Sequence, residues 1–142
     1  MSGASIVGRW SLQSWVTRSE SGALDNPFGE HAEGSLVYTA GGWVSLHLAA
    51  DDRPRQPASL LGASGTTSER AAAYSSYVAY CGTYHVEGDI VVHRVTNSLY
   101  PNWLGSELRR IFSLNSDSLV LAMPTPEGQE PLVNELHWTR ME

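Results

Sequence analysis

Basic residues and cysteine are scarce in this sequence. Its 142 residues include only 9 Lys and Arg against 15 Asp and Glu, which gives a formal net charge of -6. Nucleic-acid-binding proteins usually carry a basic stripe, and anionic membrane surfaces attract basic segments, so neither kind of partner is expected. The single cysteine, Cys81, excludes an intramolecular disulfide bond and fits a reducing compartment.

Long apolar runs and targeting signals are also lacking. No stretch of about 18 apolar residues occurs, so we expect no membrane-spanning segment. The first ten residues, MSGASIVGRW, do not join a basic region to an apolar one, so we expect no secretory signal and a cytoplasmic location. The length fits a single domain, 1–142, that buries a core without disulfide bonds.

Motifs for metal binding and covalent catalysis are missing too. The five histidines show no His-x-x-x-His spacing, and a lone cysteine cannot form a Cys-x-x-Cys pair. No Gly-x-Ser-x-Gly elbow, phosphate loop or dinucleotide fingerprint occurs. We therefore expect no metal, no cofactor and no nucleophilic mechanism.

Alternating apolar residues between turn signals predict an all-β protein. Residues 77–103 form the central hairpin, and one helix is expected at 66–76, with Thr67 as its N-cap and no capping box. The other strands are expected at 8–17, 34–39, 42–49, 108–114, 118–123 and 132–140. The resulting eight strands suggest an antiparallel up-and-down barrel, with the helix covering one end or one aliphatic face.

The turn Glu87-Gly88-Asp89 sets the register of the central hairpin. Glycine suits the first position of a type II′ loop, which needs a positive φ. With Gly88 and Asp89 as the loop, directly opposite residues share a face of the sheet. The less polar face then turns four polar side chains inward: Tyr80, Tyr84, His93 and Asn97.

The remaining strands add further inward candidates. A two-residue loop at 40–41 places Tyr38, Ser45 and His47 on one face of the sheet. Both faces of 34–49 carry apolar residues, which leaves the orientation open, and we expect the face with these three residues to line a cavity. In the first strand, Trp10, Leu12 and Val16 share one face, and Trp15 lies on the other. Pairing of 108–114 with 118–123 turns Arg110 inward and Arg109 outward.

Several segments resemble the bacterial and fungal lipocalin-like domain family. They are Gly8-x-Trp10, residues 27–30, 34–38, 77–84, His93, 100–105 and Arg109-Arg110. The resemblance implies a small stand-alone barrel, in which the first-strand Trp plugs the closed end and Arg110 stacks on it. Neighbouring barrel families include both carriers and metal-free cyclases or isomerases, so the resemblance does not settle the function.

The inward polar residues leave two roles open. His93, Tyr84 and Arg110 could act as a catalytic set, in which His93 and Tyr84 move a proton and Arg110 anchors a carboxylate or enolate. His93 and Tyr84 could instead form a core hydrogen bond, with Arg110 packed on an aromatic ring. The expected ligand-binding residues are Tyr38, Ser45, His47, Tyr80, Asn97 and Trp103.

Three functions follow from these candidates. The first is binding of a small, mostly apolar metabolite in the barrel cavity. The second is a cofactor-free cyclase or isomerase of natural-product biosynthesis that folds its substrate in the same cavity. The third is a filled barrel that serves as an assembly module, with an exposed Trp15 or Trp43 at a homodimer contact. A small molecule is the expected partner in the first two.

Overall fold

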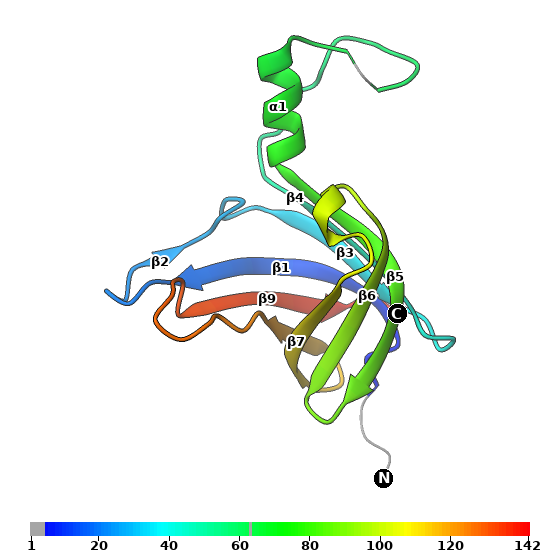
Figure 1. Ribbon diagram of the computed structural model, residues 1–142, viewed down its shortest axis with the longest axis vertical. Helices are drawn as coiled ribbons and strands as arrows, with labels where there is room; N and C mark the ends of the chain where they lie inside the picture. The colour runs from blue at the N-terminus through cyan, green and yellow to red at the C-terminus, as the bar shows by residue number, and fades with distance from the viewer. Residues whose placement is uncertain (1–4, 63) are drawn as a thin grey trace.

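The computed structural model describes residues 5–62 and 64–142 (Figure 1). One helix, α1 (Thr67–Ser75), and one 3-10 turn, η1 (Pro101–Trp103), accompany the strands. The strands are β1 (Gly8–Arg18), β2 (Leu24–Asp25), β3 (Glu33–Tyr38), β4 (Trp43–Ala49), β5 (Tyr77–Glu87), β6 (Ile90–Ser98), β7 (Glu107–Leu114), β8 (Ser118–Ala122) and β9 (Val133–Arg140).

Eight of these strands close into an antiparallel barrel. From β3 to β9 each strand pairs with the next, and β1 pairs with β3 on one side and with β9 on the other. The two-residue β2 only extends the end of β1. The predicted eight-stranded antiparallel barrel with one short helix is confirmed. A barrel of this size is just wide enough for its own side chains or one small ligand.

The β5–β6 hairpin has the predicted turn. Glu87 lies opposite Ile90, and Tyr84 lies opposite His93. Gly88 has a φ of 63°, a conformation that glycine adopts without steric penalty. The alternation turns His93 into the barrel, where it is 1% exposed.

A β-bulge shifts the register of this hairpin beyond Gly82. Gly82 pairs with Val95, whereas Cys81 pairs with Asn97, so Thr96 is an extra residue on β6. A side chain at position 82 would collide with the backbone around Arg94 and Thr96. Glycine therefore allows the two strands to approach at the bulge.

The bulge changes which side chains enter the barrel. The predicted pairing of Tyr80 with Asn97 is wrong, because Tyr80 lies opposite Ser98. Tyr80 still points inward and is 5% exposed, but Asn97 lies on the outside. A single inserted residue reverses the side of every later side chain on its strand.

The β3–β4 hairpin has a longer loop than predicted. Tyr38 pairs with Val44, and the N–H of Thr39 donates to the carbonyl oxygen of Trp43, so the loop between these partners has three residues, 40–42, instead of two. Tyr38 is inward as expected, at 1% exposure. The prediction that Ser45 and His47 share its face is wrong, because both point to the outside of the barrel while their neighbours on β4 fill the inside.

A second bulge lies in β1. Gln13 is the extra residue where β1 pairs with β9, and it reverses the alternation along the strand. Trp15 therefore packs against the core, on the same side as Trp10 and Leu12. The prediction that Val16 shares a face with Trp10 and Leu12, with Trp15 on the opposite face, is wrong for this reason.

The helix α1 projects from the barrel and does not cover it (Figure 1). None of its residues is buried. Its N-cap is Thr66, whose hydroxyl accepts the N–H of Glu69 at 3.1 Å, while the Glu69 carboxylate accepts the N–H of Thr66 at 2.8 Å. The predictions of a covering helix and of an N-cap at Thr67 without a capping box are both wrong.

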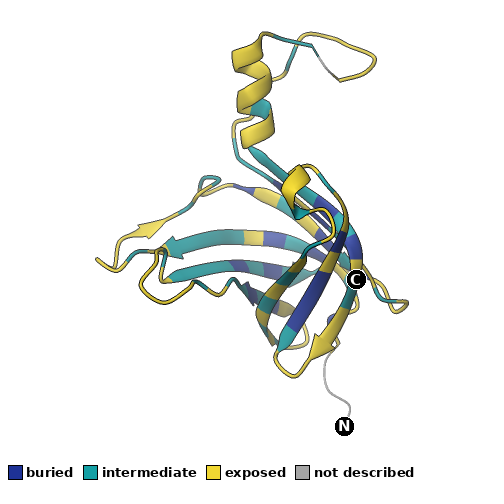
Figure 2. Cartoon of the chain, in the orientation of Figure 1, coloured by how far each residue is buried: buried dark blue, intermediate teal, exposed yellow. Residues whose placement is uncertain are grey.

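Buried residues are concentrated on the barrel strands (Figure 2). Trp10 and Trp138, at 0% and 1% exposure, are buried where the start of β1 pairs with the end of β9. The guanidinium of Arg140 lies 4.3 Å from the centre of the Trp10 ring. The expected stacking of Arg110 on Trp10 is wrong, because Arg140 pairs with Trp10 across β1 and β9 and occupies this place.

Candidate functional site

The barrel contains a cavity of about 240 Å³ near the end of β1 and the start of β5. Its wall is largely aliphatic and aromatic. Trp15 and Trp103 contribute indole rings, and the aliphatic and thioether side chains are Leu46, Leu48, Val78, Leu121, Met123 and Leu136. Trp103 therefore lies in the wall, as predicted. An apolar cavity of about 150 Å³ is enough to hold benzene, so this one has room for a single substituted ring.

Three polar residues complete the wall: Tyr80, Arg110 and Asn134. Asn134 Oδ1 accepts a hydrogen bond of 2.7 Å from Nε1 of Trp15. Sequence reasoning missed both residues of this pair. The alternation that put Leu136 and Trp138 on one face of the last strand also places Asn134 on that face. Trp15 could not be assigned to the inside from alternation, because the bulge at Gln13 reverses the faces of β1.

A hydrogen-bonded chain of three side chains runs from the cavity wall into the core. Tyr80 Oη lies 2.6 Å from Nδ1 of His93, and Tyr38 Oη lies 2.6 Å from Nε2 of the same ring. Both imidazole nitrogens are therefore satisfied, as burial requires. His93 itself is not part of the cavity wall and is connected to it through Tyr80.

Burial makes this chain electrically neutral. The pKa of His93 is lowered to about 3, mainly by desolvation and to a lesser extent by the nearby positive charge of Arg110. Desolvation raises the pKa of Tyr80 to about 12, although Arg110 opposes the rise, and burial also raises the pKa of Tyr38 well above its usual value. A neutral imidazole has one N–H donor and one acceptor, so one tyrosine donates to His93 and the other accepts from it.

Arg110 lies on β7 opposite Val91 and is partly buried in the cavity wall. Its recorded hydrogen bond runs from one guanidinium nitrogen to the carbonyl oxygen of Arg109, at 3.1 Å. Among the residues that the structure describes, no carboxylate forms an ion pair with Arg110. Arg109 points outward, as expected, and pairs with Glu87.

Tyr84 lies opposite His93 but does not bond to it. Its hydroxyl donates to the carbonyl oxygen of Thr39 at 2.7 Å, and its ring packs edge-on against Tyr38 with 4.8 Å between the ring centres. Desolvation raises the pKa of Tyr84. The His93 partners are Tyr38 and Tyr80, so the predicted His93–Tyr84 pair is replaced by a pair that sequence reasoning placed among the ligand-binding residues.

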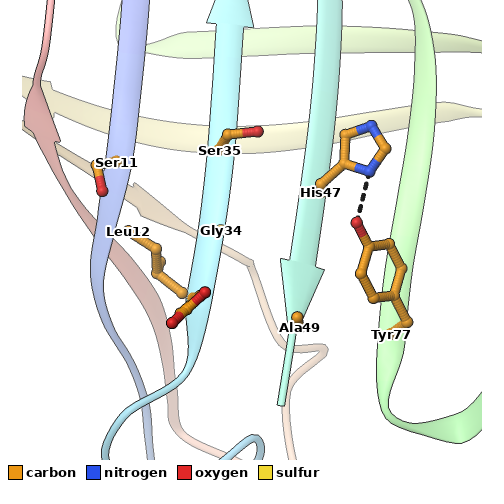
Figure 3. Close-up of a pocket in the computed structure, with 8 residues that line it drawn as sticks. Ser11, Leu12, Gly34, Ser35, His47, Ala49 and Tyr77 are labelled. Atoms are coloured by element: carbon orange, nitrogen blue, oxygen red, sulfur yellow. Dashed lines mark hydrogen bonds between the residues drawn. The ribbon is translucent and has the colours of Figure 1, made fainter. Parts of the chain in front are cut away.

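Ser45, His47 and Asn97 lie on the outer surface of the barrel. His47 faces a shallow outer groove over β1, β3, β4 and β5, where its Nδ1 lies 2.8 Å from the hydroxyl of Tyr77 (Figure 3). Asn97 and Ser45 border another outer hollow, next to Cys81. All three residues, with Tyr80, line this outer hollow, but none of them lines the inner cavity that contains Arg110.

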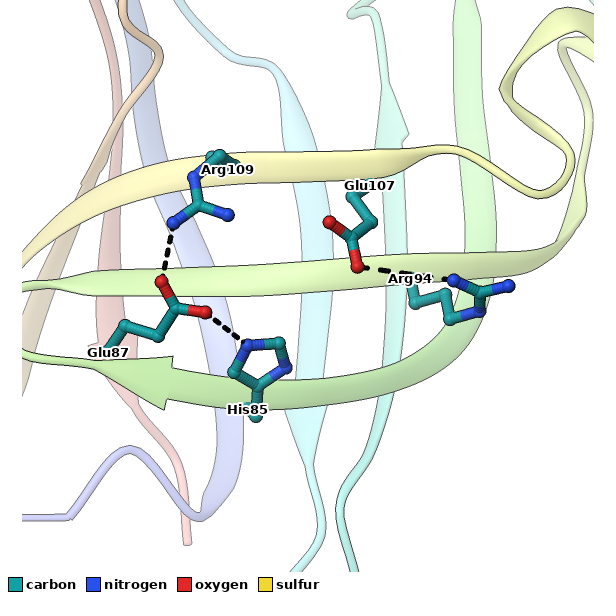
Figure 4. Close-up of polar contacts among 5 residues, drawn as sticks. All are labelled: His85, Glu87, Arg94, Glu107 and Arg109. Carbon is teal, nitrogen blue, oxygen red and sulfur yellow. Dashed lines mark hydrogen bonds and ion pairs between the residues drawn. The ribbon is translucent and has the colours of Figure 1, made fainter.

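The outer face of β5, β6 and β7 carries a line of charges (Figure 4). Glu87 lies 2.6 Å from both Arg109 and His85, and Arg94 lies 4.0 Å from Glu107. Hydrogen bonds from His85 and Arg109 lower the pKa of Glu87. Within 5–62 and 64–142, no three His, Cys, Asp or Glu residues are grouped as metal ligands. The line of charges is a solvated surface network, which contributes little to stability.

Comparison with known proteins places this barrel in a family. Residues 7–141 match the family described as the lipocalin-like domain. The chain belongs to this lipocalin-like family. The resemblance seen in the sequence motifs is thereby confirmed, over nearly the full length of the chain.

A curated relative of this lipocalin-like protein comes from Aspergillus oryzae (strain ATCC 42149 / RIB 40). It is the 4'-hydroxy-3'-methoxypropiophenone carrier protein ppsC. The two are 35% identical over an alignment of 71 residues, which covers 44% of this chain. The match spans 64% of the relative's length, less than two thirds of it.

A solved structure has the same fold as this lipocalin-like protein. A lipocalin-like protein from Bacteroides uniformis ATCC 8492 superposes with a TM-score of 0.51 at 13% sequence identity. The superposition covers 96% of this chain and 98% of the other.

In the described part of the chain, α1 is too short and too polar to cross a lipid bilayer as a helix.

Proposed function

We propose that this protein binds and carries a small, mostly apolar metabolite in the barrel cavity. The cavity itself carries the proposal: eight of its wall residues are aliphatic, thioether or indole side chains, and only three are polar. Ligand sites are typically apolar hollows with a few polar groups that fix orientation. A filled barrel would have no use for an inward guanidinium without a counter-ion.

The related fungal protein supports a carrier over an enzyme. It is named as a carrier of a propiophenone that has one substituted ring, a size that suits a cavity of about 240 Å³. A carrier needs only a fitting hollow and a few polar contacts. It needs no group that gains or loses a proton during binding.

The alternative, a cofactor-free cyclase or isomerase, has less support from the geometry. A general base works best when its pKa lies near the operating pH, and it must reach the proton it removes. The pKa of His93 is lowered to about 3, and both of its nitrogens are bonded to tyrosines. The hydroxyl of Tyr84, the other proposed proton-transfer group, is bonded to Thr39 outside the cavity.

Isothermal titration calorimetry with single-ring probes tests the proposal. Suitable probes are 4'-hydroxy-3'-methoxypropiophenone, cinnamate and cinnamamide. We expect at least one to bind with 1:1 stoichiometry and to be recovered unchanged by mass spectrometry after incubation. Conversion of a probe to an isomer or cyclised product would favour the enzyme.

Two neighbouring residues on β5 provide a matched control. Val78 lines the cavity, whereas Ala79 faces the outer hollow. Val78→Trp fills the cavity and should abolish binding, while Ala79→Trp adds the same side chain outside and should leave affinity within about twofold. Equal binding by Val78→Trp and the wild type would place the ligand elsewhere.

A further inference from the structure

The polar part of the cavity wall supplies hydrogen-bond donors and contains no acidic residue. Arg110 has five N–H donors and no acceptor, and its recorded bond to the Arg109 carbonyl uses one of them. The residues that line the cavity include no Asp or Glu. A partly buried guanidinium without a carboxylate is costly unless something else neutralises it.

Two carboxylates on β5 and β7 are already engaged elsewhere. The Glu87 carboxylate binds Arg109, and Glu107 pairs with Arg94, both on the outer face of the sheet. Within the described chain, Arg110 takes no part in the ion pairs. An anion in the cavity would supply the counter-ion that these carboxylates do not.

Tyr80 adds an oriented donor beside Arg110. When Tyr38 donates its proton to Nε2 of His93, Nδ1–H of the same ring donates to the Tyr80 oxygen. The Tyr80 proton is then available to a ligand in the cavity. Arg110 also interacts with Tyr80 through its charge and a side-chain hydrogen bond, which oppose the rise of the Tyr80 pKa caused by burial. The same positive charge favours an anionic acceptor for the Tyr80 proton.

We infer that the cavity selects single-ring, mostly apolar molecules that carry one anionic oxygen group, a carboxylate or an enolate, and that Arg110 and Tyr80 bind this group. The inference rests on the proposed binding function and adds the class of ligand. The ring would lie against Trp15, Trp103 and the aliphatic wall. His93 acts as a positioning residue that fixes the direction of the Tyr80 proton.

A matched pair of probes separates charge from shape. Cinnamate and cinnamamide have the same size and the same ring, but only cinnamate carries a negative charge at pH 7.5. Calorimetry on the full chain should show cinnamate binding at least about tenfold more tightly than cinnamamide. Arg110→Gln should reduce this preference to about twofold or less, without loss of cinnamamide binding.

Two variants serve as controls. Arg109→Gln removes the adjacent guanidinium, which points outward to Glu87, and should keep the cinnamate preference. Tyr80→Phe should lower cinnamate affinity about three- to tenfold, whereas Tyr84→Phe should leave it unchanged. Circular dichroism of each variant checks that the barrel is intact.

The possible results separate the two proposals. Equal affinity for cinnamate and cinnamamide, or a preference that survives Arg110→Gln, overturns the anion site and leaves the binding function standing. If neither cinnamate, cinnamamide nor 4'-hydroxy-3'-methoxypropiophenone binds, the binding function fails and the anion site fails with it.

Discussion

The hydroxyl of Tyr80 lies 2.6 Å from Nδ1 of His93, so a fully buried imidazole is connected to the cavity wall through one tyrosine. On its other side His93 bonds to Tyr38, at the same distance. This hydrogen-bonded chain spans three strands, β3, β5 and β6, and links the core to the cavity wall. Its two ends differ, since Tyr38 lies in the core and Tyr80 borders the ligand space.

Removing the Tyr38 hydroxyl should destabilise the barrel. Tyr38→Phe leaves Nε2 of a buried imidazole without a partner, which costs about 1–3 kcal/mol. Tyr84→Phe removes a hydroxyl from the more exposed bond to Thr39 and should cost less than about 1 kcal/mol. Urea denaturation measures both free energies of unfolding. Equal losses for the two variants would contradict the role given to the buried chain.

His93 should stay neutral in the folded protein at any pH above about 4, because its pKa is lowered to about 3. In the unfolded chain an ordinary histidine has a pKa of about 6.5. Between these values the unfolded state binds a proton that the folded state does not, so stability falls as the pH falls. For this residue alone the slope approaches about 1.4 kcal/mol per pH unit.

Nitrogen-15 NMR of the imidazole ring checks this directly. The His93 nitrogens should keep the shifts of a neutral ring, with one N–H and one acceptor, from pH 8 to pH 5. Protonation with a midpoint near pH 6.5 would show that the ring is not desolvated.

Two arginines on the barrel interior should respond in opposite ways to the same change. Arg140→Met loses the contact with Trp10 and hydrogen bonds to the carbonyls of Ser116 and Val7, and should cost about 1–3 kcal/mol. Arg110→Met removes a partly buried charge without an ion-pair partner and should be neutral or stabilising by about 1 kcal/mol.

Thermal unfolding of the ligand-free proteins measures this difference. A melting temperature that falls as far for Arg110→Met as for Arg140→Met would make Arg110 a structural residue. The same result would remove the main reason for placing an anion beside it.

Gly82→Ala should be the most harmful glycine substitution in the hairpin. Its new methyl group would meet the backbone around Arg94 at the bulge, and backbone can move only by breaking strand pairing. We expect a loss of about 2 kcal/mol or more, comparable with overpacking a core. Gly88→Ala has open space around it and only the positive φ as a penalty, about 1–2 kcal/mol. Chemical denaturation of both variants should show this order.

Alternation and turn chemistry were sufficient to predict the barrel. Each strand has a period of two, and the glycine turn at 88–89 fixed the register on both sides of it, so Tyr84 and His93 were correctly placed opposite each other. The same logic turned Arg110 inward, where it now lines the cavity. These predictions needed only local geometry, which the residues themselves determine.

Residues were assigned to the wrong side of the barrel where one extra residue in a strand or loop reversed the inward–outward alternation. The bulges at Gln13 and Thr96 and the three-residue loop at 40–42 each shifted the alternation by one. Trp15, Asn97, Ser45 and His47 were assigned to the wrong side as a result. A bulge depends on how the partner strand approaches, so a strand's own residues do not determine its position.

The identity of the partners on His93 and Trp10 could not be derived from register alone. Tyr38 reaches His93 from β3, and Tyr80 reaches it from a position on β5 four residues before the opposite residue, Tyr84. Arg140 takes the place expected for Arg110. Contacts across a closed barrel depend on how the first and last strands meet. That closure is a long-range property of the fold.

The indole N–H signals of the tryptophans give the most direct test of a ligand cavity inside the barrel. Trp15 and Trp103 line the cavity, whereas Trp43 is 42% exposed on the outside. In a proton–nitrogen NMR titration with 4'-hydroxy-3'-methoxypropiophenone, or with cinnamate if the ketone does not bind, the signals of Trp15 and Trp103 should shift together and saturate. The signal of Trp43 should not move. Saturating shifts confined to Trp43, or no shift with either probe, would contradict the cavity as the binding site.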